Sequence, residues 1–290
     1  MTSSAIVLDQ ATSELGEGPL FDPSTGTAWW FNIKGRELHA LHLASGAKSV
    51  QPLNLMASVI ALVDADQQLI ASDQGLFLRD AETGALSEYA KLEDKPGNRT
   101  NDGRVHQSGA LWISTMGRNA EQGAGAIYHV ARGVVTLLFS DITIPNGICF
   151  SPDGTIGYWS DTGINRVMRV PLDPATGLPN GEATVFAEEP ESEGGFDGAV
   201  CDAEGQMWTA RWGASAVDVY SPEGKRLARH AMPVSQPSCP AFIGETADRL
   251  LVTSAWQGLH EAGRGSDPQA GMTFELKVPV KGRFEPAYKL

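Results

Sequence analysis

The feature that most constrains this chain is a pattern that repeats along its whole length. Each copy is a short turn, written D-x-x-G where it is clearest, followed by a strand of apolar and aromatic residues. The copies recur at intervals of roughly 40–50 residues, which is the period of a propeller blade. The six segments that carry the pattern are 22–30, 64–70, 106–112, 151–159, 202–208 and 244–251.

Each copy continues into a further alternating strand, as at 37–41 and 126–130. No stretch shows a convincing helical period, and the 32 glycines and 17 prolines are typical of short strands joined by turns. We therefore predict an all-β protein, a six-bladed β-propeller with four-stranded antiparallel blades. Residues 4–8 are expected to pair with the last blade and close the ring. A pair of β-sandwiches is the competing architecture, but it does not require a repeated unit.

Composition bounds the organisation and the partners of the chain. No linker-like shift in composition interrupts it, so residues 1–290 are predicted to form a single domain. The net charge of −13 argues against a nucleic-acid partner or an anionic membrane. The chain also lacks an apolar run long enough to cross a bilayer and an N-terminal secretory pattern. With only three scattered cysteines and no C-x-x-C pair, the expected location is the cytoplasm.

Polar residues recur just before the turns, in the strand that would line the central channel of a propeller. Glu17, Asn101, Asn146 and Asp197 occupy this place, each closely followed by glycine. In the last three the turn glycine follows eight positions later, whereas Glu17 is one residue off that count. Because inner strands converge on the propeller axis, we expect the four side chains to meet there.

Two carboxylates and two amides at one axis predict a bound cation. Buried carboxylates must be neutralised, paired or bound to metal. Their oxygens suit Ca²⁺ first, with Mg²⁺ or Mn²⁺ also compatible. No histidine or cysteine lies at this position, which argues against a zinc site of the usual kind, although Zn²⁺ and Fe²⁺ stay open as alternatives. A single Asn-Gly or Asp-Gly pair usually marks only a turn, but four at one place in a repeat favour a shared metal centre.

Four longer motifs contain these residues: LGEGP at 15–19, RTNDG at 99–103, PNGICFSPDG at 145–154 and FDGAVCDAEGQMW at 196–208. Together they resemble one known family, the SMP-30/gluconolactonase/LRE-like family, and the resemblance covers essentially the whole chain. It implies a six-bladed propeller that holds a divalent cation at the mouth of its channel and hydrolyses aldonolactones.

The resemblance also implies roles for individual residues. Glu17, Asn146 and Asp197 correspond to the metal ligands, and Asp197 also to the general base that takes a proton from the attacking water. The cation would act as a Lewis acid on the lactone carbonyl. Arg99 and Asn101 correspond to residues that contact the substrate.

Three further residues are candidates for the pocket. Glu121, in the loop that follows 115–117, is matched to a substrate-contacting glutamate of the family. Trp212 and Trp256 each come just after a predicted strand, which makes them candidates for lining the pocket. The other tryptophans mostly fall within repeat strands and are expected to pack between blades.

The expected activity is metal-dependent hydrolysis of a sugar lactone, and two alternatives stay open. An esterase or phosphotriesterase could use a similar propeller and calcium centre. A non-catalytic calcium-binding propeller would bind metal without turnover. The sequence does not identify the sugar, the ring size, the metal or the oligomeric state.

Overall fold

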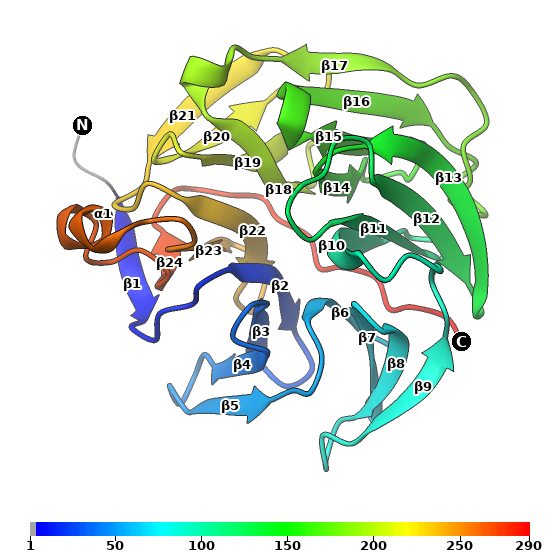
Figure 1. Cartoon of the computed structure of the whole chain (residues 1–290), viewed down its shortest axis with the longest axis horizontal. Coiled ribbons are helices and arrows are strands. Elements are labelled where there is room, and N and C mark those ends of the chain that lie inside the picture. Colours follow the sequence, from blue (N-terminus) through cyan, green and yellow to red (C-terminus); the bar gives the residue numbers. More distant parts are fainter. Residues whose placement is uncertain (1–3) are drawn as a thin grey trace.

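The computed structural model describes residues 4–290 and confirms the six-bladed β-propeller (Figure 1). Six four-stranded antiparallel sheets stand around a common centre, with one inner strand of each sheet facing it. From the inner strand outwards, the first three blades are β2 (Gly16–Asp22), β3 (Thr27–Asn32), β4 (Glu37–His42) and β5 (Lys48–Pro52); β6 (Ala57–Leu62), β7 (Gln67–Ser72), β8 (Gly75–Asp80) and β9 (Leu86–Ala90); and β10 (Asn98–Val105), β11 (Leu111–Gly117), β12 (Gly125–Ala131) and β13 (Val134–Ile142).

The other three blades follow the same plan, and the sixth takes its outer strand from the beginning of the chain. They consist of β14 (Pro145–Phe150), β15 (Ile156–Asp161), β16 (Arg166–Pro171) and β17 (Thr184–Glu188); β18 (Gly195–Cys201), β19 (Met207–Trp212), β20 (Ala216–Tyr220) and β21 (Arg226–Ala231); and β22 (Pro237–Ile243), β23 (Arg249–Ser254), β24 (Thr273–Leu276) and β1 (Ala5–Asp9).

The pairing of β1 with β24 confirms the expected closure of the ring. The two strands run antiparallel, with Val7 opposite Phe274. Because this sheet combines a strand from the beginning of the chain with strands from near its end, the first and last blades are held in a continuous circle (Figure 1).

Over residues 4–290, helical structure is confined to short segments in loops: η1 (Thr162–Ile164), η2 (Glu191–Glu193) and α1 (Glu261–Ser266). In the described part of the chain, no helix is long and apolar enough to span a membrane.

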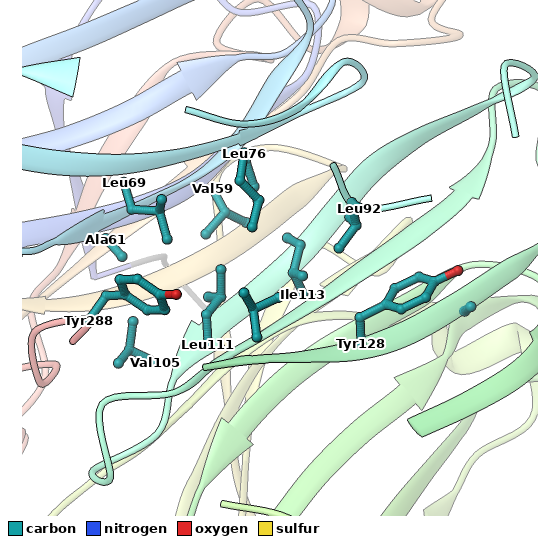
Figure 2. Close-up of a cluster of buried hydrophobic side chains, with 13 residues drawn as sticks. Val59, Ala61, Leu69, Leu76, Leu92, Val105, Leu111, Ile113, Tyr128 and Tyr288 are labelled. Carbon is teal, nitrogen blue, oxygen red and sulfur yellow. The ribbon is translucent and has the colours of Figure 1, made fainter. Parts of the chain in front are cut away.

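The hydrophobic core lies between neighbouring blades rather than at the centre of the ring. Among the residues that the structure describes, buried side chains form six clusters, and each joins two adjacent sheets. Figure 2 shows the cluster between the second and third blades, where Val59 and Leu69 meet Leu111 and Ile113. The aromatic residues of the repeat pack in the same way, with Trp112 fully buried against the fourth blade. The channel is therefore left to the polar side chains of the inner strands.

Residues 277–290 cross the end of the channel where the inner strands finish (red in Figure 1). Arg283 donates to the carbonyl oxygens of Phe150 and Cys201, on β14 and β18. Glu285 pairs with Arg104, a buried residue of β10. This segment therefore covers the end of the channel where the inner strands finish.

Candidate functional site

A cavity of about 410 Å³ lies at the open end of the channel. It is lined by five of the six residues predicted for the site, contributed by β2, β10, β14 and β18: Glu17, Arg99, Asn101, Asn146 and Asp197. Each of the five is at most 8% exposed. The propeller thus brings together side chains from four different blades.

The inner strands position these side chains at a bulge in their pairing with the second strand of the blade. Glu17 and Asn146 are the last paired residues before the bulge, and each is followed by a glycine with positive φ. Asn101 and Asp197 lie inside the bulge itself. Counted along the sequence to the turn glycine, only Glu17 differs from the other three residues. In the structure the four residues divide into two pairs: Glu17 and Asn146 lie just before the bulge, and Asn101 and Asp197 lie within it.

Two of the converging groups are carboxylates held out of water. Burial, followed by repulsion from Asp102, raises the pKa of Glu17 to about 8. Burial, followed by repulsion from Glu17, raises the pKa of Asp197 well above its usual value. Within the described residues, neither carboxylate has a lysine, arginine or histidine nitrogen within 4.0 Å. The negative charge of either group, when it is ionised, is therefore not paired directly by the protein.

Asp102 lies deeper in the channel and adds to this negative charge. Its carboxylate accepts the backbone N–H groups of Gly103 and Ile148 at 2.8 and 2.7 Å. Burial nevertheless dominates and raises the pKa of Asp102 to about 6. Because its oxygens accept hydrogen bonds from β10 and β14, Asp102 holds these two inner strands together. It is not among the residues that line the cavity.

Arg99 supplies positive charge to the cavity without a close carboxylate partner. Burial lowers its pKa to about 10, although Glu17 opposes this shift. Its Nη1 donates to Asn101 Oδ1 at 2.8 Å and to the carbonyl oxygen of Thr100 at 2.9 Å. Among the described groups these are the hydrogen bonds that Arg99 forms, so its other N–H groups are available to a ligand in the cavity.

The Asn101 carboxamide is almost fully engaged within the protein. Its Nδ2 donates to Asn146 Oδ1 at 2.7 Å and to the carbonyl oxygen of Pro145 at 2.9 Å. Both N–H groups are therefore used, and what Asn101 can offer a substrate is the remaining lone pair of its Oδ1. Its contacts make it a direct support for Asn146.

The donor set fits a hard divalent cation. Carboxylate oxygens of Glu17 and Asp197 and the carbonyl oxygen of Asn146 are the ligand types that Ca²⁺ prefers. No cluster of three or more His, Cys, Asp or Glu side chains with the arrangement of a metal site is present in the described part of the chain. A cation here would therefore depend on an amide oxygen, which softer metals such as Zn²⁺ favour less.

The wall of the cavity includes residues that the motifs do not single out. Arg118 and Asn119 line it from the loop after β11, and Arg118 Nη2 pairs with Asp73 Oδ2 at 2.7 Å. Glu121, from the same loop, is exposed and does not line the cavity. Its carboxylate accepts hydrogen bonds from the backbone N–H and from the side-chain Nδ2 of Asn119. The structure thus does not bring Glu121 together with the other predicted site residues.

The two tryptophans proposed for the pocket have different places. Trp212 lines the cavity as expected, although it is the last residue of β19 and not the residue after a strand. Trp256 is outside the lining, and its ring is covered by the guanidinium of Arg264 at 4.3 Å. Thr162, which follows β15, also lines the cavity. No motif pointed to Thr162, because a lone threonine after a strand carries no signal of its own.

Comparison with known proteins accounts for this arrangement. The sequence profile of the SMP-30/Gluconolactonase/LRE-like region matches residues 15–256, which include every residue of the proposed site. The chain belongs to this family. The five predicted site residues that line the cavity thus all lie within the region that this family shares.

Relatives and solved structures extend over almost the full chain. A Rhizobium meliloti (strain 1021) protein that carries the provisional name sugar lactone lactonase is 63% identical over 99% of this chain and 98% of its own length. An L-arabinolactonase of Azospirillum brasilense is 31% identical, covering 96% and 93%. The crystal structure of a calcium-binding protein, regucalcin, from Agrobacterium tumefaciens has a TM-score of 0.97 at 62% identity, covering 98% and 97%.

Proposed function

We propose that this SMP-30 family protein hydrolyses a sugar lactone to the corresponding sugar acid, with a divalent cation held by Glu17, Asn146 and Asp197. Ca²⁺ is the first candidate for the cation. The observation that carries the proposal is the meeting of two buried, unpaired carboxylates and an amide oxygen in one cavity with the cavity-facing Arg99. The lactonase names of the relatives and the calcium-binding name of the structural neighbour support it.

Each group in the cavity has a role in this reaction. A cation bound there would polarise the lactone carbonyl as a Lewis acid. Asp197 accepts the proton of the attacking water, because burial, followed by repulsion from Glu17, raises its pKa above the usual value and so makes its carboxylate a stronger base. Arg99 donates its free N–H groups to the carbonyl or hydroxyl oxygens of the lactone. Met116 and Trp212 provide an apolar wall for the C–H face of a sugar ring.

The size of the cavity suits a small substrate. Its volume of about 410 Å³ falls within the range of roughly 300–1,000 Å³ that is common for small-molecule sites. Polar and apolar groups are mixed in its lining, as expected for a polyhydroxylated ring. We therefore place the substrate among the lactones of single pentoses and hexoses.

Acid release from a panel of lactones tests the proposal. Purified protein is assayed with glucono-, xylono-, arabinono- and galactonolactone, before and after EDTA and with added Ca²⁺, Mg²⁺, Mn²⁺ or Zn²⁺. We expect turnover of at least one lactone, its loss with EDTA and its return with cation. Asp197→Ala should lose both activity and cation binding while its circular dichroism spectrum stays that of the parent.

The same experiment separates the alternatives. Turnover of simple esters or phosphotriesters without any lactone would replace lactonase by esterase activity. Cation binding without hydrolysis of any substrate would indicate a non-catalytic propeller. Full activity of Asp197→Ala would remove this residue from the site.

A further inference from the structure

Beyond the ligands themselves, the structure assigns Thr162 as the residue that orients Asn146 towards the cation and ties it to the strand that carries Asp197. Thr162 is a positioning residue in this proposal, which rests on the proposed cation site. The evidence is a directed series of hydrogen bonds across three blades. It runs from Asn101 on β10 through Asn146 and Thr162 in the fourth blade to the carbonyl oxygen of Phe196 on β18.

Thr162 determines the direction of its hydrogen bond with Asn146. Its hydroxyl donates to the carbonyl oxygen of Phe196 at 2.6 Å. A backbone carbonyl can only accept, and a hydroxyl has a single proton to give. The contact between Thr162 Oγ1 and Asn146 at 2.9 Å must therefore be donated by Asn146, so its Nδ2 faces Thr162. The Oδ1 of Asn146 consequently points to the other side.

The hydrogen bonds of Asn101 indicate the same orientation of the Asn146 carboxamide. Asn101 Nδ2 donates to the carbonyl oxygen of Pro145, which again can only accept. Since the N–H side of Asn101 is thereby defined, the group facing it at 2.7 Å must be an acceptor, Asn146 Oδ1. This oxygen keeps a second lone pair for a cation. Asn146 is held from both sides with its oxygen away from Thr162.

Thr162 is itself fixed in place. Asp161 accepts the N–H groups of Thr143, Ile144 and Gly163 at 3.0 Å each. The N–H of Thr162 donates to the carbonyl oxygen of Ile144 at 3.0 Å. A turn anchored in this way holds the hydroxyl of Thr162 in one position between β14 and β18. Its bond to Phe196, the residue before Asp197, links two cation ligands that belong to different blades.

The physical expectation is a loss of cation affinity when the hydroxyl is removed. Thr162→Val keeps the shape of the side chain but leaves the Nδ2 group of Asn146 without its acceptor. The carboxamide is then held from the Asn101 side alone, and the hydroxyl no longer links Asn146 to the strand that carries Asp197. Groups that orient metal ligands from outside typically change affinity by about 10–100-fold when they are replaced.

Calorimetric titration with Ca²⁺ and Mn²⁺ tests this assignment on the full-length protein, after EDTA treatment and dialysis. Thr162→Val should bind at least about tenfold more weakly than the parent, and Thr162→Ser, which restores the hydroxyl, should stay within about twofold. Thr184→Val is the matched control, because Thr184 is an exposed residue of the outer strand in the same blade. It should bind like the parent. Circular dichroism and a melting curve establish that each variant is folded.

The outcomes distinguish this inference from the proposed function. Equal affinity of Thr162→Val and parent would overturn the positioning role while leaving lactone hydrolysis untouched. Weak binding by both Thr162→Val and Thr162→Ser would also overturn it, because the hydroxyl would not be the cause. A parent that binds neither cation would overturn both proposals. Binding that depends on Thr162 in a protein without lactone turnover would support the positioning role and reject the lactonase.

Discussion

The buried carboxyl groups of the proposed cation site make a prediction about the protein without a bound cation. Glu17 is buried beside other carboxylates, and its pKa is raised from 4.5 to about 8. A carboxyl that holds its proton more tightly in the folded state favours folding at low pH. This contribution is fully present below the unfolded pKa and is lost as the pH rises towards the folded pKa. The cation-free protein should therefore become less stable between about pH 4.5 and 8.

Glu17→Gln removes the titration while keeping the shape of the side chain. At pH 7 the parent has lost stability over the interval from 4.5 to 7, and 2.5 pH units at 1.36 kcal/mol each correspond to about 3 kcal/mol. Glutamine retains a carbonyl oxygen that can accept the N–H of Gly18, as the carboxylate does at 3.1 Å. The variant should thus be more stable than the cation-free parent by about this amount at pH 7 and nearly equal to it at pH 4.5.

Thermal unfolding in EDTA at several pH values measures this difference. For a chain of 290 residues, about 3 kcal/mol corresponds to a rise in Tm on the order of 5 °C. Glu182→Gln is the control, because Glu182 is exposed. Added Ca²⁺ should raise the Tm of the parent and leave that of Glu17→Gln unchanged. A variant that is no more stable than the parent at pH 7, or a difference that does not grow with pH, would refute the electrostatic reasoning.

Three further predictions concern packing and the substrate. Gly18→Ala should cost more than about 3 kcal/mol in urea unfolding, because its Cβ would lie 2.0 Å from the carbonyl oxygen of Ser58 at a φ of +56°; Gly46→Ala, at a φ of +69° with open space, should cost only about 1–2 kcal/mol. Equal costs would contradict the close approach of the inner strands. Tyr288→Ala should destabilise by about 3–5 kcal/mol in the same assay, since its side chain is 1% exposed under the second and third blades, and an unchanged midpoint would show that the C-terminal segment adds nothing to stability. Arg99→Lys should lower kcat/KM for the best lactone on the order of 10²-fold, because an ammonium group cannot both hold Asn101 and reach the substrate, and undiminished turnover would exclude that role.

Much of the architecture could be predicted from local pattern. Strands that pack between blades show alternation and aromatic residues, and turns show Gly, Asp and Pro. The first three strands of each blade, counted from the channel outwards, can therefore be recognised along the sequence. The outer strands are harder to see, because they are largely exposed. In β5 (Lys48–Pro52), for example, four of five residues are exposed and no apolar alternation remains.

Within the site, the residues that could be predicted are those at a fixed place in the repeat. Glu17, Asn101, Asn146 and Asp197 were found because each precedes a recognisable turn on an inner strand. Their division into two registers could not be found, since it depends on where each strand forms its bulge. Matching Glu121 by its loop placed it at the cavity, but the loop turns its carboxylate back onto Asn119.

The sequence by itself determined the repeat, the number of blades and the type of ligand atoms, because these follow from short-range periodicity and from the chemistry of single side chains. Only the tertiary structure decided which hydroxyl faces Asn146, how Arg118 reaches Asp73 across the rim, and that residues 277–290 close the far end of the channel. The first of these contacts lies within one blade, the second joins two blades, and the third joins the C-terminal segment to β18. All three depend on the packing of segments that are distant along the chain, which no local segment encodes.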